Sequence, residues 1–145
     1  MRSGTLTLVT DSCLDHVFLV AAAMRGIARD CGLDELNAAQ VELAVVEAVN
    51  NAIEHAYAGH PGHRVEVHVA VAGGRLTVEV ADTGAGMQWD VVRASALARA
   101  EADPLAEGGR GLLIITEVMD EVGYRRDGER NVLRLTKRIG DGAIG

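Results

Sequence analysis

The stretch RVEVHVAVAGGRLTVEVAD, residues 64–82, decides the fold expected of this chain. Valines alternate with polar or small residues in its first half, and Leu76, Val78 and Val80 alternate with polar residues in its second half. Strict alternation predicts two half-buried strands. Between them, Gly73-Gly74 supplies the positive φ that a tight hairpin turn requires. Because a hairpin sets its two strands side by side in opposite directions, this part of the sheet is predicted to be antiparallel.

A short strand and a helix are expected before this hairpin. Leucines alternate with threonines over Thr5–Val9, which indicates a strand. Asp11 or Ser12 is a suitable N-cap for the helix, which is predicted to end near Asp30. The apolar stripe expected on this helix consists of Leu14, Val17, Phe18, Ala21 and Met24.

A second, longer helix is predicted to start at Asp34, with Asn37 as the alternative cap, and to end near Tyr57. Its apolar residues recur at helical spacing and define one face that would pack on the sheet. The members of this face are Val41, Val45, Ala48, Val49, Ala52, Ile53 and Ala56.

The C-terminal half contains a connection, a helix and a second hairpin. Residues 87–108 show only short helical patches, so we expect a mobile connection there. Leu112–Met119 is a compact apolar helix, and strands at 122–126 and 132–136 flank a turn at Asp127-Gly128. The expected fold is therefore α+β, a two-layer α/β sandwich with a mixed, mostly antiparallel sheet and helices on one face. We expect one domain over residues 1–145, with its core at about residues 5–137.

Composition excludes several functional classes. The chain has 145 residues, is 48% hydrophobic and carries a formal net charge of −7, so a nucleic-acid partner is not expected. No apolar run reaches the about 20 residues of a membrane span. Cys13 and Cys31 fit no disulfide framework, which favours a cytoplasmic protein. Lys137 is the only lysine, so the chain has neither a P-loop nor the early strand lysine of eukaryotic-type protein kinases.

Asp82 is the most informative candidate site residue. It continues the even-numbered register of the three buried residues before it, which would turn a carboxylate toward the core. A buried charge needs hydrogen-bond donors. These donors are either backbone N–H groups of the following turn or the exocyclic amine of a bound base. Gly84 and Gly86 in that turn permit close approach of the backbone to a ligand.

Glu47 and Asn51 lie one helical turn apart and therefore face the same way. The carboxamide oxygen of Asn51 suits Mg²⁺, which takes one or two protein ligands together with phosphates and water. Glu47 is placed to deprotonate a hydroxyl that attacks a γ-phosphate. The alternative for this pair is a solvated polar face of the helix.

A second glycine-rich segment, Gly108 to Leu112, precedes the compact apolar helix. A glycine-rich turn that feeds a helix N-terminus presents free N–H groups to phosphate. Gly109, Arg110, Gly111 and Leu112 are therefore candidate phosphate-binding residues, and a flexible hinge before the helix is the alternative.

In order and setting, these segments resemble the motifs of the ATPase superfamily shared by gyrase B, Hsp90, MutL and histidine kinases. The matching parts are Glu47-x-x-x-Asn51 on a helix, Asp82-x-Gly84-x-Gly86 after a strand and Gly109-x-Gly111 before a helix. Over about residues 5–137 the chain resembles the small bacterial anti-sigma-factor serine kinases. The resemblance implies the Bergerat-type ATP-binding fold.

The resemblance also implies roles for these residues. Asn51 would ligate Mg²⁺, Glu47 would be the general base and Asp82 would bind the adenine amine. Gly84 and Gly86 would shape the adenine pocket, and Gly109 and Gly111 would hold the phosphates, with residues 87–108 as the ATP lid. Relatives often place threonine near adenine on the last strand pair, where this chain has Asn131 and Val132.

Such kinases phosphorylate a STAS-type anti-anti-sigma protein, sequester a sigma factor and usually form homodimers. Two alternatives stay open. A detached ATP-binding domain of a histidine kinase would usually carry Asn, not Glu, at position 47. A non-catalytic ATP-binding module could switch partners without transferring phosphate.

Overall fold

The computed structural model describes residues 2–105 and 110–140. Five strands form one sheet in the order β1-β2-β3-β5-β4. Each neighbouring pair is antiparallel, so the sheet is wholly antiparallel in this part of the chain and the mixed sheet named in the prediction is not found. The strand bounds are β1 Gly4–Asp11, β2 Arg64–Ala72, β3 Arg75–Asp82, β4 Glu121–Asp127 and β5 Arg130–Arg138.

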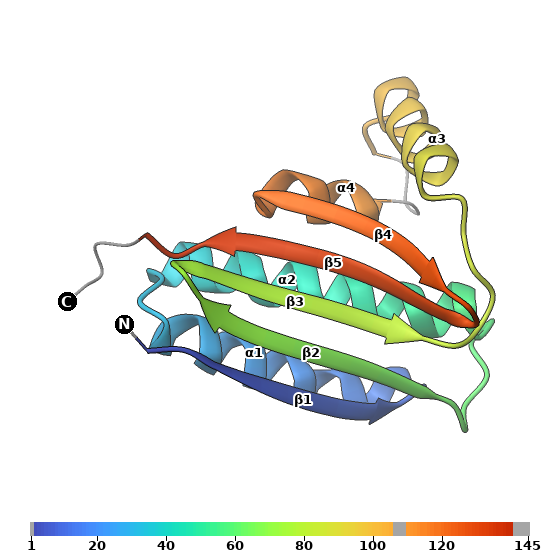
Figure 1. Ribbon diagram of the computed structural model, residues 1–145. Coiled ribbons are helices and arrows are strands. Elements are labelled where there is room, and N and C mark those ends of the chain that lie inside the picture. The colour runs from blue at the N-terminus through green and yellow to red at the C-terminus, as the bar shows by residue number, and fades with distance from the viewer. Residues whose placement is uncertain (1, 106–109, 141–145) are drawn as a thin grey trace.

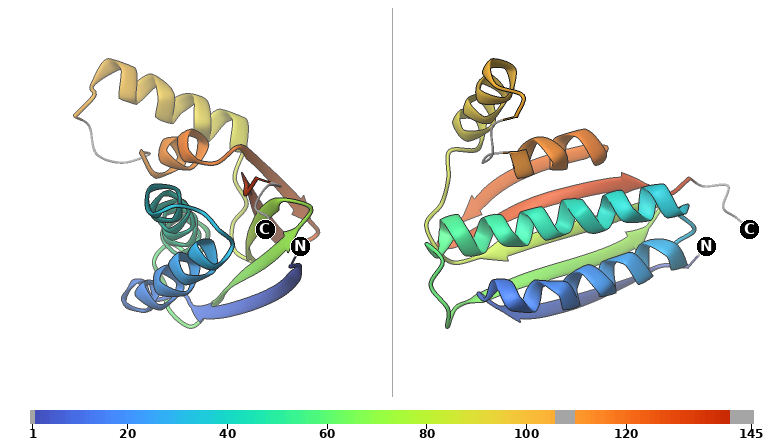
Figure 2. Two further views of the ribbon diagram at one scale, coloured as in Figure 1. Left: turned by 90° about the vertical axis from the view of Figure 1, so that its left-hand side faces the viewer. Right: turned by 180° about the vertical axis from the view of Figure 1, so that it is seen from behind.

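Helices cover one face of this sheet, which confirms the α+β two-layer arrangement (Figures 1 and 2). Two of them, α1 and α2, lie side by side behind the sheet, and α4 lies behind β4 and β5. The helix bounds are α1 Val17–Asp30, α2 Glu35–Asn51, α3 Trp89–Ala102 and α4 Arg110–Val118. Within the described residues, no helix combines the length and the apolar character needed to cross a membrane.

The second helix agrees closely with its prediction. Asp34 is the N-cap, and its carboxylate accepts a hydrogen bond of 2.8 Å from the backbone N–H of Asn37. After Asn51 the backbone continues as a π-helical turn, Ala52–Ala56, which brings the helical segment to the predicted end. All of the predicted apolar face is buried except Ala56, which is half-buried.

The first helix differs from its prediction in both its cap and its buried face. Ser12 does not cap it: its hydroxyl donates to the carbonyl of His60 at 2.7 Å, and Asp11 ends β1. A 3₁₀ turn, Leu14–His16, comes first. Of the predicted stripe, Val17 and Met24 are buried and Ala21 is half-buried, whereas Leu14 and Phe18 are exposed. The buried face consists of Val17, Val20, Met24 and Ala28.

The expected irregular connection contains a regular helix, α3. Only Ala96 of this helix is buried, so it has little of the amphipathic pattern that sequence periodicity detects. Alanine-rich composition explains the helix instead, because alanine has the highest intrinsic helix propensity. The helix projects past the β4 edge of the sheet and packs on α4 (Figure 1).

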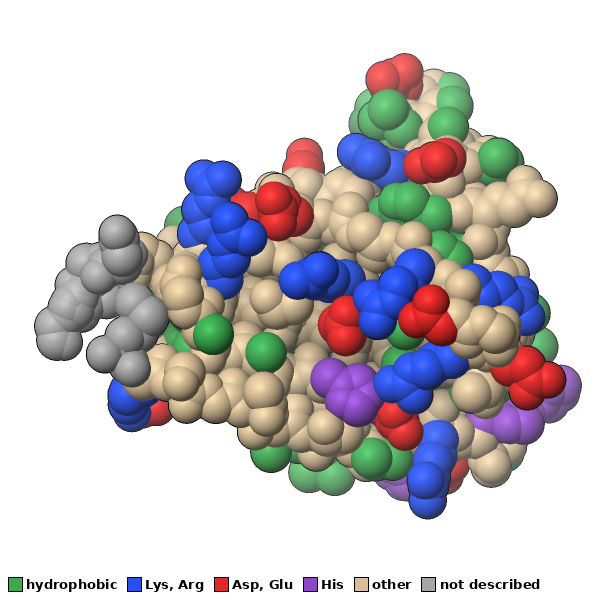
Figure 3. Space-filling view, in the orientation of Figure 1, with side chains coloured by type: hydrophobic (Ala, Val, Ile, Leu, Met, Phe, Trp, Pro, Cys, Tyr) green, Lys and Arg blue, Asp and Glu red, His purple; other side chains and the backbone are tan. Residues whose placement is uncertain are grey.

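The other face of the sheet carries interleaved charges. Basic and acidic side chains stand next to one another on it (Figure 3). Arg130 pairs with Glu66 at 2.9 Å, and Arg125 pairs with Glu79 at 2.8 Å. Because these pairs are partly exposed, each contributes little to stability. The fold thus presents its helices and its candidate site residues on one side and an ion-paired sheet surface on the other.

Candidate functional site

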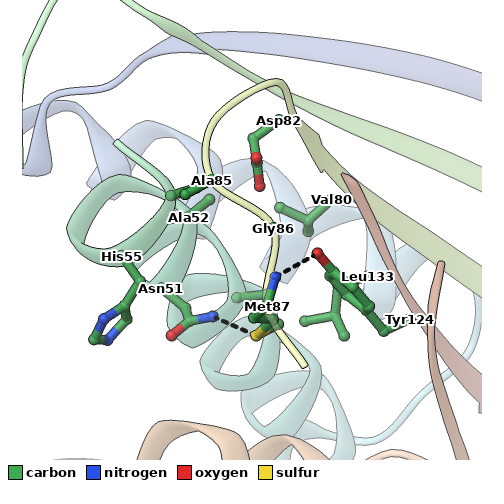
Figure 4. Close-up of a pocket in the computed structure, with 12 residues that line it drawn as sticks. Asn51, Ala52, His55, Val80, Asp82, Ala85, Gly86, Met87, Tyr124 and Leu133 are labelled. Atoms are coloured by element: carbon green, nitrogen blue, oxygen red, sulfur yellow. Dashed lines mark hydrogen bonds between the residues drawn. The ribbon is translucent and has the colours of Figure 1, made fainter. Parts of the chain in front are cut away.

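A cavity of about 70 Å³ lies between the C-terminal half of α2, the end of β3 and the inner side of β4 and β5 (Figure 4). It brings Asn51 and Asp82, which come from different predicted segments, to one place. Its lining consists of Ala48, Asn51, Ala52, His55, Ala56, Val80, Asp82, Ala85, Gly86, Met87, Tyr124 and Leu133.

Asp82 lies at the end of β3, where the carboxylate continues the buried side of the strand, as its register predicts. One carboxylate oxygen, Oδ1, accepts from the backbone N–H of Gly84 at 3.0 Å and from the Asn131 amide at 2.8 Å. The turn therefore supplies one of its donors. The other oxygen, Oδ2, has no hydrogen-bond partner within the described residues and is the atom available to a ligand.

Burial raises the pKa of Asp82 above its ordinary value. Hydrogen bonds from Asn131 and Gly84, and then the charge of Arg126, act in the opposite direction but do not cancel the effect of burial. A carboxylate with one oxygen fixed and one free, in a half-buried pocket, is suited to accept a hydrogen bond from an amine of a ligand.

Asn131 holds this carboxylate in place. It lies opposite Asp82 in the β3–β5 pairing and is only 2% exposed. Its amide nitrogen also donates to the carbonyl of Gly84 at 3.0 Å. The reasoning from strand register that applies to Asp82 applies to Asn131 as well. Asn131 is a polar residue at an inward-facing position of β5, in register with the buried Leu133 and Leu135.

The Asp82–Gly86 turn is closely packed at both of its glycines. A Cβ at Gly84 would collide with the carbonyl of Ala56, and one at Gly86 would meet the Arg126 guanidinium. The buried Tyr57 hydroxyl fixes the same turn, since it accepts from the backbone N–H of Thr83 at 2.9 Å. Gly84 therefore permits close packing against the backbone of the π-helical turn Ala52–Ala56, whereas at Gly86 the neighbouring atom is the flexible end of Arg126 on β4.

Glu47 and Asn51 lie on α2, and both are half-buried. Burial raises the pKa of the Glu47 carboxyl, and the nearby charge of Glu54 raises it further. A general base benefits from a pKa shifted toward neutrality, provided that the group is still deprotonated at the working pH. The environment of Glu47 is therefore compatible with the predicted base.

The second glycine-rich segment lies next to the Glu47 side chain at Gly111. This residue lies in the first turn of α4, and a Cβ there would collide with the Glu47 carboxylate. Leu112 has its side chain in the hydrophobic core, so only its backbone is available to a ligand. Arg110 begins α4, whereas Gly108 and Gly109 lie outside the described residues.

Two residues at the cavity were not singled out from the sequence. Tyr124 lies on the inward side of β4, and Met87 follows the Asp82–Gly86 turn. The Met87 backbone N–H donates to the Tyr124 hydroxyl at 3.0 Å. Alternation with Val122 could have placed Tyr124 on the inner face, but no local signal links it to position 87.

The geometry thus assembles a half-buried carboxylate with one free oxygen, a carboxamide and a partly buried carboxylate beside a glycine at a helix N-terminus. Residues 11–137 match the family described as histidine kinase-like ATPase domain. The chain belongs to this family. Its members' ATP-binding fold agrees with the helix-on-sheet architecture and with the predicted α+β class.

Individual relatives place the chain more narrowly within the histidine kinase-like ATPases. It is 34% identical over 113 residues to serine-protein kinase RsbW of Bacillus pumilus, covering 74% of this chain and 70% of the relative. It is 28% identical over 140 residues to serine-protein kinase RsbW of Listeria monocytogenes serotype 4a, covering 94% and 88%. The crystal structure of the RsbU and RsbW domains of Rv1364c from Mycobacterium tuberculosis superimposes with a TM-score of 0.66 at 24% identity, covering 94% of this chain and 32% of that chain, which supports the fold.

Proposed function

We propose that this protein is an ATP-dependent serine/threonine protein kinase that acts as an anti-sigma factor. It would phosphorylate a STAS-type anti-anti-sigma partner and sequester a sigma factor. The observation that carries the proposal is one cavity lined by Asp82 and Asn51, with Glu47 one turn before Asn51 on α2. Similarity to proteins named serine-protein kinase supports this choice over a detached histidine-kinase domain.

Each residue has a distinct task in the proposed reaction. The free oxygen of Asp82 accepts a hydrogen bond from the exocyclic amine of adenine, and this selects the base. Glu47 takes the proton of the acceptor hydroxyl as its oxygen bonds to the γ-phosphorus. The bond between that phosphorus and the β–γ bridging oxygen breaks, and ADP leaves with the electron pair.

Mg²⁺ fits the donors at the Asn51 end of the cavity. The carboxamide oxygen of Asn51 is a hard ligand of the kind that Mg²⁺ prefers. No cluster of three or more His, Cys, Asp or Glu side chains able to hold a metal occurs in the described part of the chain. Phosphate and water oxygens would therefore complete the coordination, which is the usual arrangement for this ion. When bound, Mg²⁺ would neutralise phosphate charge.

We further propose that the protein acts in the cytoplasm as a homodimer formed through β1 and α1. The outer edge of β1 pairs with no other strand in the described sheet. Beside it, α1 and the 3₁₀ turn before it expose three large apolar side chains. A second copy is the partner best matched to an open strand edge next to an apolar helix surface. The three side chains are Leu14, Phe18 and Leu19.

The kinase proposal is tested by incubating the protein with Mg²⁺-ATP and a cognate STAS protein, followed by mass spectrometry of the STAS protein. We expect phosphoserine or phosphothreonine on the partner. The Glu47→Gln variant should bind ATP with unchanged affinity but transfer phosphate at least about a hundredfold more slowly, because general-base catalysis contributes 10²–10⁴.

Glu117→Gln is the matched control, since Glu117 is an exposed glutamate on α4 and should leave the rate unchanged. If the protein binds ATP but phosphorylates no partner, the kinase proposal is wrong and the assignment becomes a non-catalytic partner-switching module. Acid-labile phosphohistidine in place of phosphoserine would favour the histidine-kinase alternative. Full-rate transfer by Glu47→Gln would remove Glu47 from the role of base.

A further inference from the structure

The turn that follows Asp82 is attached to the end of the helical segment that contains α2. The backbone N–H of Ala85 donates to the carbonyl of Ala56 at 2.9 Å. This carbonyl lies at the end of the π-helical turn Ala52–Ala56, where the last carbonyls of a helical segment find no donor within the segment. Gly84 packs against the same carbonyl. The turn therefore rests directly on the backbone of this helix end.

Tyr57, the residue after the π-helical turn, makes a second attachment through its hydroxyl. The hydroxyl accepts from the backbone N–H of Thr83 at 2.9 Å and donates to the carbonyl of Arg64, the first residue of β2, at 2.7 Å. Tyr57 is only 6% exposed, and its ring stacks on that of His63 with centroids 4.5 Å apart and planes 4° from parallel. Because burial and stacking hold the ring, the hydroxyl has a defined position.

The N–H that Tyr57 binds belongs to the peptide group that joins Asp82 to Thr83. A peptide group is planar, so fixing its N–H also restrains the Cα of Asp82. The hydrogen bonds from Gly84 and Asn131 both reach Oδ1 of the carboxylate, and neither constrains Oδ2 directly. With Oδ1 held by these two bonds and Cα held through Tyr57, Oδ2 has one defined position at the cavity (Figure 4).

We propose that Tyr57 is a positioning residue for recognition of the base, because its hydroxyl fixes the backbone of Asp82 and thereby aims Oδ2 at the exocyclic amine of adenine. This inference rests on the proposed binding of ATP. Within the described residues, the cavity lining does not include Tyr57, so its effect on binding passes through Asp82. The expected result of losing the hydroxyl is a loss of selectivity for the amine, which weaker folding alone would not produce.

The experiment compares two Mg²⁺-nucleotide complexes by calorimetry: Mg²⁺-ADP and the Mg²⁺ complex of purine riboside 5′-diphosphate, which is ADP without its exocyclic amine. Tyr57→Phe keeps the ring but removes the hydroxyl. It should weaken the binding of Mg²⁺-ADP about three- to tenfold, part of the worth of one hydrogen bond to a charged group. Binding of the compound without the amine should stay within about twofold of the wild-type value, because it makes no hydrogen bond to Asp82.

Ser12→Ala is the matched control, because it removes another buried hydroxyl with the same pair of bonds. The Ser12 hydroxyl donates to the carbonyl of His60 at 2.7 Å and accepts from the backbone N–H of His63 at 3.0 Å, and Ser12 is 1% exposed. Both substitutions should lower the melting temperature, since each leaves a buried N–H and a carbonyl without a partner. Only Tyr57→Phe should change the ratio of the two nucleotide affinities.

A double-mutant cycle tests whether Tyr57 acts through Asp82. In the Asp82→Asn background, Tyr57→Phe should change the affinity for Mg²⁺-ADP by less than about twofold, because two residues that act through one contact are not additive. A variant that is partly unfolded without ligand is assayed by the rise in melting temperature that each nucleotide causes, since this rise reports binding to the folded protein.

The outcomes distinguish this inference from the proposed function. If Tyr57→Phe binds Mg²⁺-ADP with wild-type affinity, loses affinity equally for both nucleotides, or is additive with Asp82→Asn, the inference is wrong while the kinase proposal stands. Wild-type protein that binds the two nucleotides equally well would also overturn it, since no amine is then recognised. If the wild-type protein binds neither nucleotide, the proposed function and the inference fail together.

Discussion

In the proposed function, Asp82 has two effects that oppose each other energetically. Its carboxylate is half-buried, and burial raises its pKa, so the ionised form is less stable in the folded protein than in water. The same burial strengthens a hydrogen bond to a ligand amine, because the surrounding dielectric is low. A site residue that weakens the folded state in exchange for ligand recognition is expected where function and stability compete.

We therefore predict that Asp82→Asn weakens ATP binding but stabilises the nucleotide-free protein at neutral pH. The asparagine oxygen can still accept from Gly84 and Asn131, whereas the buried charge is gone. The pKa of Asp82 is higher in the folded than in the unfolded protein, so burial of this side chain costs no stability below the unfolded pKa of about 3.9. The wild-type protein loses stability as pH rises from there through the folded pKa. ATP affinity should fall about ten- to hundredfold, the worth of one hydrogen bond to a charged group.

Urea unfolding at pH 7 and near pH 3.5 measures the stability effect, and calorimetry measures ATP binding. The gain in unfolding free energy should be present at pH 7 and absent at the acidic pH. Asp15→Asn, an exposed aspartate before α1, serves as the control. Unchanged ATP affinity in Asp82→Asn would show that this carboxylate does not bind the base.

At the scale of elements, the site depends on how closely α4 approaches α2. Gly111 allows this approach, because any side chain there would meet the Glu47 carboxylate. At its other end, α4 is held by Lys137, whose ammonium donates to the carbonyl of Val118 at 2.7 Å. A cation at a helix C-terminus also interacts favourably with the helix dipole. The helix is thus positioned against the proposed base at its start and against β5 at its end.

Gly111→Ala is predicted to separate stability from activity. Alanine favours a helix by up to about 1 kcal/mol over glycine, and the atom that it meets is the flexible end of Glu47. The carboxylate can rotate away, so the unfolding free energy should be unchanged or higher. Phosphate transfer should fall at least about tenfold, because the base is displaced from its position. Chemical denaturation and single-turnover transfer assays measure the two effects.

Gly26→Ala is a suitable control, since a Cβ there would meet no atom within 4 Å and Gly26 lies in α1. It tests the gain in helix stability without contact with the site. A Gly111→Ala variant that transfers phosphate at the wild-type rate would show that the contact with Glu47 does not matter for catalysis.

At the scale of the whole molecule, the two edges of the sheet differ in what adjoins them. The β4 edge is adjoined by α4 and by the projecting α3 (Figure 1). The β1 edge has α1 beside it, and Phe18 on that helix is 66% exposed. Large apolar side chains gathered next to an unpaired strand favour association with another chain.

We expect the wild-type protein to be a dimer by light scattering coupled to size exclusion, and Phe18→Glu to be a monomer, because a buried unpaired carboxylate is incompatible with an interface. Leu105→Glu is the matched control: Leu105 is 90% exposed and follows α3, far from β1. A monomeric wild-type protein, or a Phe18→Glu variant that remains dimeric, would contradict the proposed interface.

Much of this architecture was predictable because its signals are local. Alternation over residues 64–82 predicted the β2–β3 hairpin, and the apolar spacing of residues 41–53 predicted the buried face of α2. The position of Asp82 followed from strand register alone. Helix α3 was missed because it buries almost nothing, and of the stripe predicted for α1, Val17 and Met24 are buried but Phe18 is exposed.

Side-chain periodicity depends only on neighbouring positions, so it was enough to predict the strands, the main helices, the fold class and the polar residues that interrupt apolar patterns. Which of these residues share a cavity could be read only from the three-dimensional fold. Asn51, Met87 and Tyr124 come from α2, the segment after β3, and β4, and no spacing in the chain relates them. Contacts between such distant segments arise from sheet order and helix packing, which are properties of the whole fold.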